Sequence, residues 1–335
     1  MTVIRLHALD TVADFPASVI TIGNFDGVHR GHQAMVARVM AHARQENLQP
    51  VVLLFEPQPQ EFFRGLEAPP RITSWREKVE QLYQLGIRTI VIIHFDSAFR
   101  HLSAAQFVQL LRARLNARQL VIGDDFRFGC DRVGDQHFLR EAGFRVETLD
   151  TLIEGPERIS STWIRQALAA GNFPLAGQLL GRPYEISGRV VYGDQIGRTL
   201  DFPTANIALN RPQPCLEGIY AVDVMLCHAK QRWQAVAEGG ISGFSPNSLF
   251  GAAHVGKRPA IHKETADEWR LEVHLPGISQ AMLYGCRLTV RFRHFLHGVR
   301  PYPSLAALQL GIAQDVRELV ALQARHSSLY WPIQS

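Results

Sequence analysis

Short apolar runs alternate with amphipathic stretches through the first half of the chain. The runs are rich in β-branched residues, which predicts strands, and cover residues 19–22, 51–55, 89–95, 120–122 and 145–149. Stretches with helix-forming patterns cover residues 33–46, 75–85, 104–116 and 137–142. This alternation predicts a doubly wound parallel sheet with helices on both faces.

The pattern changes after two short helical stretches, 162–170 and 174–180, which Gly171 and Gly181 are placed to end. Strand-like runs at 185–192, 219–226, 233–236, 270–275 and 286–295 are separated by Gly, Pro and Asn. They predict a small antiparallel barrel, and helical spacing over 305–322 predicts a C-terminal helix. With a boundary near Gly181–Tyr184, we expect domains over 1–181 and 182–335.

Composition fits this picture and narrows the possible partners. The 335 residues are 46% hydrophobic and 20% charged, as expected of a soluble two-domain protein. A net charge of +4 without a dense basic tract gives no indication of a nucleic-acid partner. No apolar run approaches the ~20 residues that span a bilayer, and the first 20 residues lack a signal-peptide core. Four scattered cysteines predict reduced thiols in the cytoplasm. The oligomeric state stays open.

The most informative segment is residues 21–33, TIGNFDGVHRGHQ. A predicted strand ends there in a Gly/Asn/Asp/Gly turn, and His29 and His32 follow three residues apart. If they open a helix, both imidazoles lie on one face beside its positive N-terminus, which suits a triphosphate. The alternative from spacing alone is two histidines capping a surface helix.

Two more suggestive loops follow predicted strands. One is FEPQP at 55–59 and the other is GDDFRFG at 123–129. Ligands of doubly wound sheets bind beyond the carboxyl ends of the strands. We therefore expect these loops and the two histidines at one edge of the sheet.

The string GNFDGVHRGHQ at 23–33 resembles the nucleotidyltransferase signature. More specifically, it resembles the adenylyltransferase module of bacterial bifunctional riboflavin kinase/FAD synthetases. RISSTWIR at 158–165 is similar to the ISSTxIR motif of the same enzymes, although alone it would indicate an ordinary helix cap with a solvated arginine. GDDFRFG is similar to their flavin-holding loop, which makes Asp125 and Arg127 candidate flavin ligands; the alternative is a turn with a local salt bridge.

This resemblance implies that the phosphate of FMN attacks the α-phosphate of ATP and that pyrophosphate leaves, giving FAD. His29, His32 and Arg165 are then expected to stabilise the transferring group. Mg²⁺ would offset phosphate charge. The candidate nucleotide-binding residues of this half are Gly23, Asn24, Asp26, Gly31, Ser160, Ser161 and Thr162.

Residues 188–206 resemble the riboflavin kinase module of the same family. The resemblance assigns ATP binding to Gly193, Gly197 and Arg198, and contact with Mg²⁺ and ATP to Thr204 and Asn206. LEVHL at 271–275 is similar to the strand with the catalytic carboxylate, so Glu272 is the candidate base for the riboflavin 5′-hydroxyl. Without the resemblance, Glu272 would be an ordinary solvent-facing residue of a strand.

The second half departs from the family pattern in several places. Asp201, His254, Ala260 and His297 replace the usual glycine, asparagine, threonine and arginine, and a Gly/Ser/Pro-rich stretch covers about 237–250. We expect a bifunctional enzyme that converts riboflavin and ATP to FMN and then to FAD. The alternatives are an adenylyltransferase whose barrel only binds flavin or regulates, a flavin carrier, and a nucleotidyltransferase with another substrate.

Overall fold

The computed structural model divides into two compact units. It describes residues 1–7, 14–150, 152–155, 157–192, 204–226, 249–257, 268–276, 278 and 283–326. The α/β unit comprises Met1–Ile164 with Leu179–Gly181, and the barrel unit comprises Arg165–Gln178 with Arg182–Ser335. Residues 165–178 thus group with the barrel, and the assignment of functions to 1–181 and 182–335 stays a prediction.

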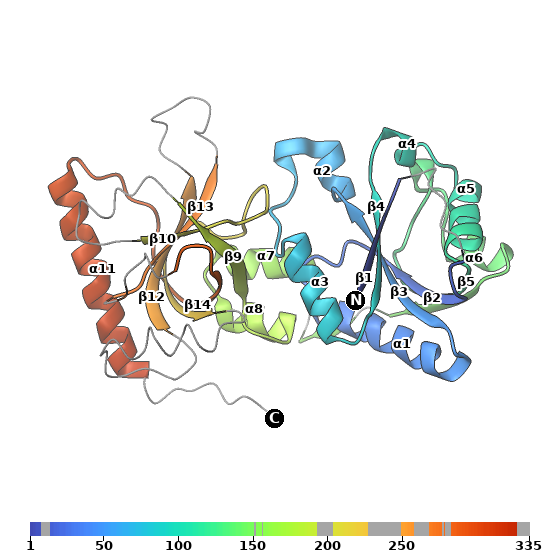
Figure 1. Cartoon of the computed structure of the whole chain (residues 1–335), viewed down its shortest axis with the longest axis horizontal. Helices are drawn as coiled ribbons and strands as arrows, with labels where there is room; N and C mark the ends of the chain where they lie inside the picture. The colour runs from blue at the N-terminus through green and yellow to red at the C-terminus, as the bar shows by residue number, and fades with distance from the viewer. Residues whose placement is uncertain are drawn as a thin grey trace. The chain divides into compact units, whose positions relative to one another are not determined.

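The α/β unit is built on a six-stranded parallel sheet, as the alternating pattern predicted (Figure 1). Its strand order is β1-β4-β3-β2-β5-β6. Neighbouring strands run parallel throughout. The bounds are β1 Thr2–Leu6, β2 Ser18–Ile22, β3 Gln49–Glu56, β4 Thr89–His94, β5 Ala117–Gly123 and β6 Arg145–Leu149.

Helices cover both faces of the sheet. On one face α1 (Arg30–Glu46) and α3 (Trp75–Gln84) bury Val39 and Leu82 against alternate residues of β3 and β4. On the other face α5 (Ala104–Gln109) and α6 (Gln136–Glu141) bury Phe107 and Leu139 against the intervening residues. Since both faces are buried, residues 51–55 of β3 and 90–93 of β4 are apolar without interruption, which is why these strands were predicted correctly.

Several elements of this unit were not predicted. The edge strand β1 pairs with β4, and of its five residues only Leu6 is fully buried. Two short helices, α2 (Pro59–Arg64) and α4 (Ser97–Arg100), lie in predicted loops. The predicted helix over 104–116 ends as α5 at Gln109 and continues as a π-helical turn, η2 (Leu110–Arg114). The remaining elements are η1 Gly65–Glu67, η3 Cys130–Arg132, β7 Ile153–Glu154 and β8 Glu157–Arg158.

The barrel unit holds a closed antiparallel barrel of order β10-β13-β12-β11-β14-β9, confirming the predicted fold class. Its helix α11 lies against β12 (Figure 1). The strands are β9 Glu185–Val191, β10 Thr204–Ile207, β11 Gly218–Leu226, β12 Leu249–Lys257, β13 Trp269–His274 and β14 Arg287–His297. The remaining helices are α7 Ser161–Ala169, α8 Phe173–Leu180 and α11 Leu305–His326, and α7 and α8 each have residues in both units.

Two of the barrel strands, β10 and β12, were missed. β12 contains Gly251, Ala252, Ala253 and Gly256, which have low strand propensity. A Cβ on Gly251 would lie 2.5 Å from the carbonyl oxygen of His274, so close strand packing requires glycine there. The predicted strand over 233–236 lies outside the described residues. Among the helices that the structure describes, none is both long and apolar enough to cross a membrane.

Candidate active sites

The turn after β2 holds a strained backbone between buried side chains. Phe25 and Val28 have positive φ values of 48° and 42°, which L residues rarely adopt, and both are 1% exposed. Gly27 between them also has a positive φ, 83°, which glycine adopts without steric cost. Strain of this kind persists only where surrounding structure enforces it, and it gathers at functional sites.

Asp26 anchors this turn to the segment before α3. Its carboxylate accepts hydrogen bonds from the backbone N–H groups of Ile72 and Thr73, both at 3.1 Å, and from the Thr73 hydroxyl at 3.2 Å. The Thr73 hydroxyl oxygen accepts in turn from the N–H of Gly27 at 3.0 Å. Asp26 is 2% exposed. It therefore shapes the turn, and its contact with a nucleotide stays a prediction.

Lys78 braces the same turn from α3. Its ammonium donates to the carbonyl oxygen of Asn24 at 2.5 Å, and the residue is 1% exposed. Burial lowers the pKa of Lys78, and attraction to the Asp26 carboxylate opposes that shift. Removing either charge would leave the other with less compensation in a low-dielectric interior.

We predict that Asp26→Ala destabilises the α/β unit by about 3–5 kcal/mol. The substitution leaves two buried N–H donors unsatisfied and weakens the compensation of Lys78. Urea unfolding of the whole chain measures the effect, with the exposed Asp150→Ala as the matched control. A loss below 1 kcal/mol for Asp26→Ala would contradict the anchoring role.

His29 and His32 lie together at the start of α1, as predicted. Their rings stack with centroids 3.6 Å apart, and the ring of Phe25 lies 4.7 Å from that of His32. His29 is the N-cap residue, and His32 lies in the first turn. A Cβ on Gly31 would approach the His29 ring to 3.2 Å, so glycine there leaves room for the stack. Two imidazoles thus gather at a helix terminus that favours anions.

The ISST segment is fastened to the turn that precedes the histidines. The Ser161 hydroxyl donates to the backbone carbonyl of Asp26 at 2.9 Å. The Ser160 hydroxyl oxygen accepts from the N–H of Trp163 at 3.2 Å, as a helix cap does. Thr162 lies in the first turn of α7, and Arg165 follows Ser161 by four residues on the same helix face.

The loop after β5 contains the predicted flavin candidates. A guanidinium nitrogen of Arg158 lies 3.0 Å from a carboxylate oxygen of Asp125, and both side chains are more than half exposed. Arg127 is exposed and donates to the carbonyl of Phe126 at 3.0 Å. This ion pair joins Asp125 to a residue outside the 123–129 loop, so it is not the salt bridge within the turn that we considered as the alternative. Its exposure leaves a flavin role as a prediction.

The strand order explains why three of the candidate segments lie at the same edge of the sheet. β2 lies between β3 and β5, so the histidines, the loop after β3 and the 123–129 loop follow three adjacent strands. From β2 the chain proceeds through β3 and β4 on one side and β5 and β6 on the other. Between β2 and β5 the order reverses, and ligands of doubly wound sheets bind at such a switch point.

The loop after β3 contains an ion-pair cluster that we did not predict. Arg71 donates to Glu56 at 2.7 Å and also to Glu61, and its side chain is 5% exposed. With Thr73 and Lys78, it stiffens the edge beside the histidines. Lys78 offered one signal, because it interrupts an otherwise apolar face of α3 between Trp75 and Leu82. Arg71 gave no signal, since isolated charges in loops are common.

In the barrel, the predicted kinase residues lie on one face of neighbouring strands. Asn206 of β10 pairs with Glu272 of β13, and Glu272 pairs on its other side with His254 of β12. Thr204 lies two residues before Asn206 and therefore faces the same way. These positions are half-buried, between fully buried neighbours. The nucleotide candidates Gly193, Gly197 and Arg198, the departures Asp201 and Ala260, and residues 237–248 lie outside the described residues.

Asn206 supplies an oxygen suited to a hard cation. Its Oδ1 is buried and has no hydrogen-bond partner among the residues that the structure describes. A buried acceptor without a partner reduces the stability of the folded protein unless a ligand interacts with it. The hydroxyl of Thr204 offers a second oxygen on the same strand face, and oxygen ligands are the type that Mg²⁺ prefers.

His297 and His254, the two departures that are described, have distinct surroundings. Nε2 of His297 lies 2.8 Å from a carboxylate oxygen of Asp315, which joins β14 to α11. Burial lowers the pKa of His254, while the Glu272 and Glu217 carboxylates oppose the shift. Both histidines are therefore integrated into the barrel.

His254 is expected to make the barrel less stable in mild acid. Its pKa in the folded protein lies below the unfolded value of 6.5, so the unfolded chain binds more protons in that range. The stability that uncharged His254 contributes to the folded barrel is fully present above pH 6.5, and it is lost as the pH falls toward the pKa of the folded protein. Urea unfolding at pH 7.5 and 5.5 should show a smaller loss of stability for His254→Asn than for the unchanged protein. An equal loss of stability in the two proteins would contradict the lowered pKa of His254.

Comparison with known proteins gives matches to both halves. A family model described as FAD synthetase matches residues 12–163, and one described as riboflavin kinase matches residues 180–322. The chain is 41% identical over 302 residues to a bifunctional riboflavin kinase/FMN adenylyltransferase of Escherichia coli (strain K12), covering 89% of this chain and 90% of the relative. Identity to the protein of the same name from Pseudomonas fluorescens is 41% over 311 residues, covering 91% and 93%. A crystal structure described as a macrolide-efflux protein from Streptococcus pneumoniae matches with a TM-score of 0.75 and 27% identity, covering 98% of this chain and all of the other.

Proposed function

The chain belongs to the family of bifunctional riboflavin kinases/FMN adenylyltransferases, and we propose that it makes FAD from riboflavin in two ATP-dependent steps. Riboflavin is phosphorylated to FMN, and FMN is adenylylated to FAD with release of pyrophosphate. The observation that carries the adenylyl step is the stacked His29–His32 pair at the N-terminus of α1. We assign this step to residues 1–181 and the kinase step to residues 182–335.

In the adenylyl step, an oxygen of the FMN phosphate forms a bond to the α-phosphorus of ATP. The bond between the α-phosphorus and the bridging oxygen breaks, and pyrophosphate leaves. His29 and His32 are assigned to donate hydrogen bonds to the phosphate oxygens on which charge develops, with Arg165 as a further cation. The strained turn and the Asp26 anchor hold the two rings in place before substrate arrives.

In the kinase step, Glu272 is assigned to accept the proton of the riboflavin 5′-hydroxyl while that oxygen attacks the γ-phosphorus of ATP and ADP leaves. Asn206 and Thr204 would hold Mg²⁺ on the same face as Glu272. When bound, the ion offsets the charge of the phosphates. The cross-strand pairing of Asn206 with Glu272 keeps the phosphate-binding side chains beside the base.

The alternative of a barrel that only binds flavin is less favoured. The match to riboflavin kinase spans residues 180–322, and the relatives with 41% identity carry both activities in their names. His254 and His297, which depart from the usual pattern, are accommodated within the barrel. A cytoplasmic location is part of the proposal and is supported by the scattered cysteines.

A single chromatographic assay tests the proposal. The protein is incubated with ATP and Mg²⁺, with riboflavin in one tube and FMN in another. FAD from both substrates is the expected result. FAD from FMN alone would restrict the protein to the adenylyl step, and no product from either would leave only flavin binding.

A further inference from the structure

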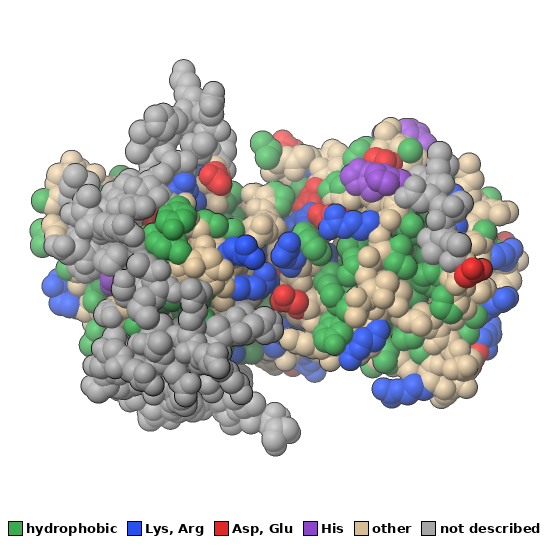
Figure 2. Space-filling model, in the orientation of Figure 1, with side chains coloured by type: hydrophobic (Ala, Val, Ile, Leu, Met, Phe, Trp, Pro, Cys, Tyr) green, Lys and Arg blue, Asp and Glu red, His purple; other side chains and the backbone are tan. Residues whose placement is uncertain are grey.

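A group of potential metal ligands lies at the end of β1 and β4, outside both proposed active sites. β1 and β4 are parallel neighbours, with Leu6 opposite Ile93. The next residues along the two strands are therefore His7 and His94, and Asp96 follows two positions later at the start of α4. Histidine and acidic side chains reach the surface together beside β4 and α4 (Figure 2).

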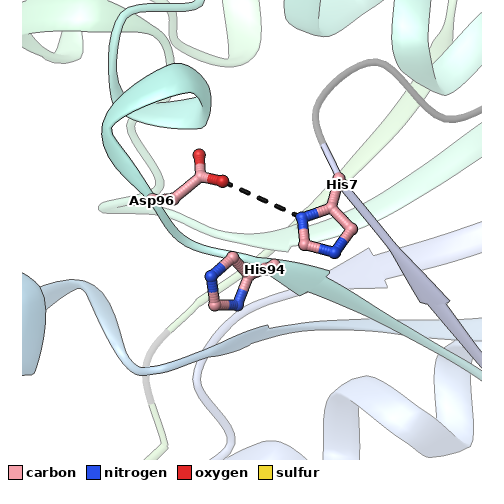
Figure 3. A group of neighbouring side chains, drawn as sticks. All are labelled: His7, His94 and Asp96. Carbon is pink, nitrogen blue, oxygen red and sulfur yellow. Dashed lines mark ion pairs between the residues drawn. The ribbon is translucent and has the colours of Figure 1, made fainter.

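The three side chains surround a common space (Figure 3). One ligand atom from each residue lies within 4.8 Å of the others. Nδ1 of His7 is 3.9 Å from Oδ2 of Asp96, and the two imidazole centroids are 5.0 Å apart. Around a tetrahedral ion with bonds of 2.0–2.2 Å, donor atoms lie roughly 3.4 Å apart. Both histidines are exposed, so small side-chain rotations can close the difference.

The Asp96 carboxylate is already oriented for this role. Its Oδ1 accepts the N–H of Phe99 at 2.8 Å, as the N-cap of α4. Oδ2 is the oxygen that lies toward His7. The backbone beside it is also fixed, because the N–H of Phe95 donates to the carbonyl of Glu56 on β3 at 3.2 Å. Hydrogen bonds that orient a ligand from behind are typical of metal sites in proteins.

We propose that His7, His94 and Asp96 bind a divalent transition-metal ion of the zinc class. Two imidazoles and one carboxylate suit Zn²⁺ and related ions, whereas Mg²⁺ and Ca²⁺ prefer oxygen ligands alone. Three protein ligands leave one position for water. The ion would link the end of β1 to β4 and α4.

This site does not depend on the nucleotide sites. In the sheet, β3 lies between β4 and β2, and it is β2 that leads to His29 and His32. His7, His94 and Asp96 are not among the residues that we assign to binding phosphates or flavin. Binding should therefore occur in the absence of ATP, and its loss should leave FAD formation unchanged.

Zinc titration of the whole chain, freed of metal and without nucleotide, tests the proposal. Calorimetry should detect one Zn²⁺ whose affinity falls at least about tenfold in His7→Ala and in His94→Ala, since each removes a direct ligand. Asp96→Asn keeps an N-cap acceptor but loses the charge, and it should also weaken binding. His137→Ala removes an exposed histidine of α6 and should bind as the unchanged protein does.

Co²⁺ provides a second readout, because its visible absorption changes when protein nitrogens bind it. The unchanged protein and His137→Ala should give the same spectrum, and His94→Ala should lose it. Equal Zn²⁺ affinity in the unchanged protein, His7→Ala and His94→Ala would overturn the proposal, as would a titration without binding. Circular dichroism verifies that each variant is folded.

Discussion

Replacing His29 or His32 by alanine is expected to lower the rate of FAD formation from FMN by about 10²-fold or more. In the proposed mechanism each ring donates a hydrogen bond to a phosphate oxygen on which charge develops, and loss of one such donor typically costs this much. Because the stacked rings lie 3.6 Å apart at the N-terminus of α1, we expect them to act on the same group. Losses in the double variant should therefore be less than additive.

The same variants should phosphorylate riboflavin at the normal rate, since the kinase residues belong to the other unit. His101→Ala, which changes an exposed histidine after α4, is the matched control and should leave both activities unchanged. Steady-state assays with FMN and with riboflavin as the first substrate separate the two effects. Normal FAD synthesis by a folded double variant would remove the histidines from the mechanism.

Glu272→Gln is expected to reduce riboflavin phosphorylation by about 10²–10⁴-fold. The amide has nearly the shape of the carboxylate but cannot accept the hydroxyl proton, and general-base catalysis contributes this range. Because Asn206 and His254 pair with residue 272 on either side, the substitution should preserve the strand register. FAD formation from supplied FMN should be little changed.

Glu268→Gln is the matched control, since Glu268 has an exposed side chain just before the same strand. Its kinase rate should equal that of the unchanged protein. A Glu272→Gln protein that phosphorylates riboflavin at the normal rate would refute the base assignment. Comparison of kcat and KM shows whether the loss lies in the chemical step.

The parts of the fold that could be predicted are those with a strong local pattern. β3 and β4 are apolar on both faces, and α1 follows a distinctive turn, so all three elements could be predicted from the sequence. β12 was missed because its alanines and glycines give little strand signal. Its place depends on its neighbours β11 and β13.

The candidate sites were predicted unevenly for a related reason. His29 and His32 are three residues apart on one helix, so local geometry alone brings their rings together. The pairing of His254 with Glu272 depends on strand register, which no local pattern specifies. The anchoring of Asp26 by Thr73 joins residues 47 positions apart. Such contacts follow from tertiary packing and could not be predicted.

The most direct test of the account is the formation of FAD from riboflavin by a mixture of two defective variants. With ATP and Mg²⁺, neither Glu272→Gln nor the His29→Ala/His32→Ala protein should make appreciable FAD from riboflavin alone. Mixed together they should, because the histidine variant releases FMN that the Glu272 variant adenylylates. If the mixture makes no more FAD than either variant alone, although each keeps its other activity, the claim of two independent sites acting in sequence is contradicted.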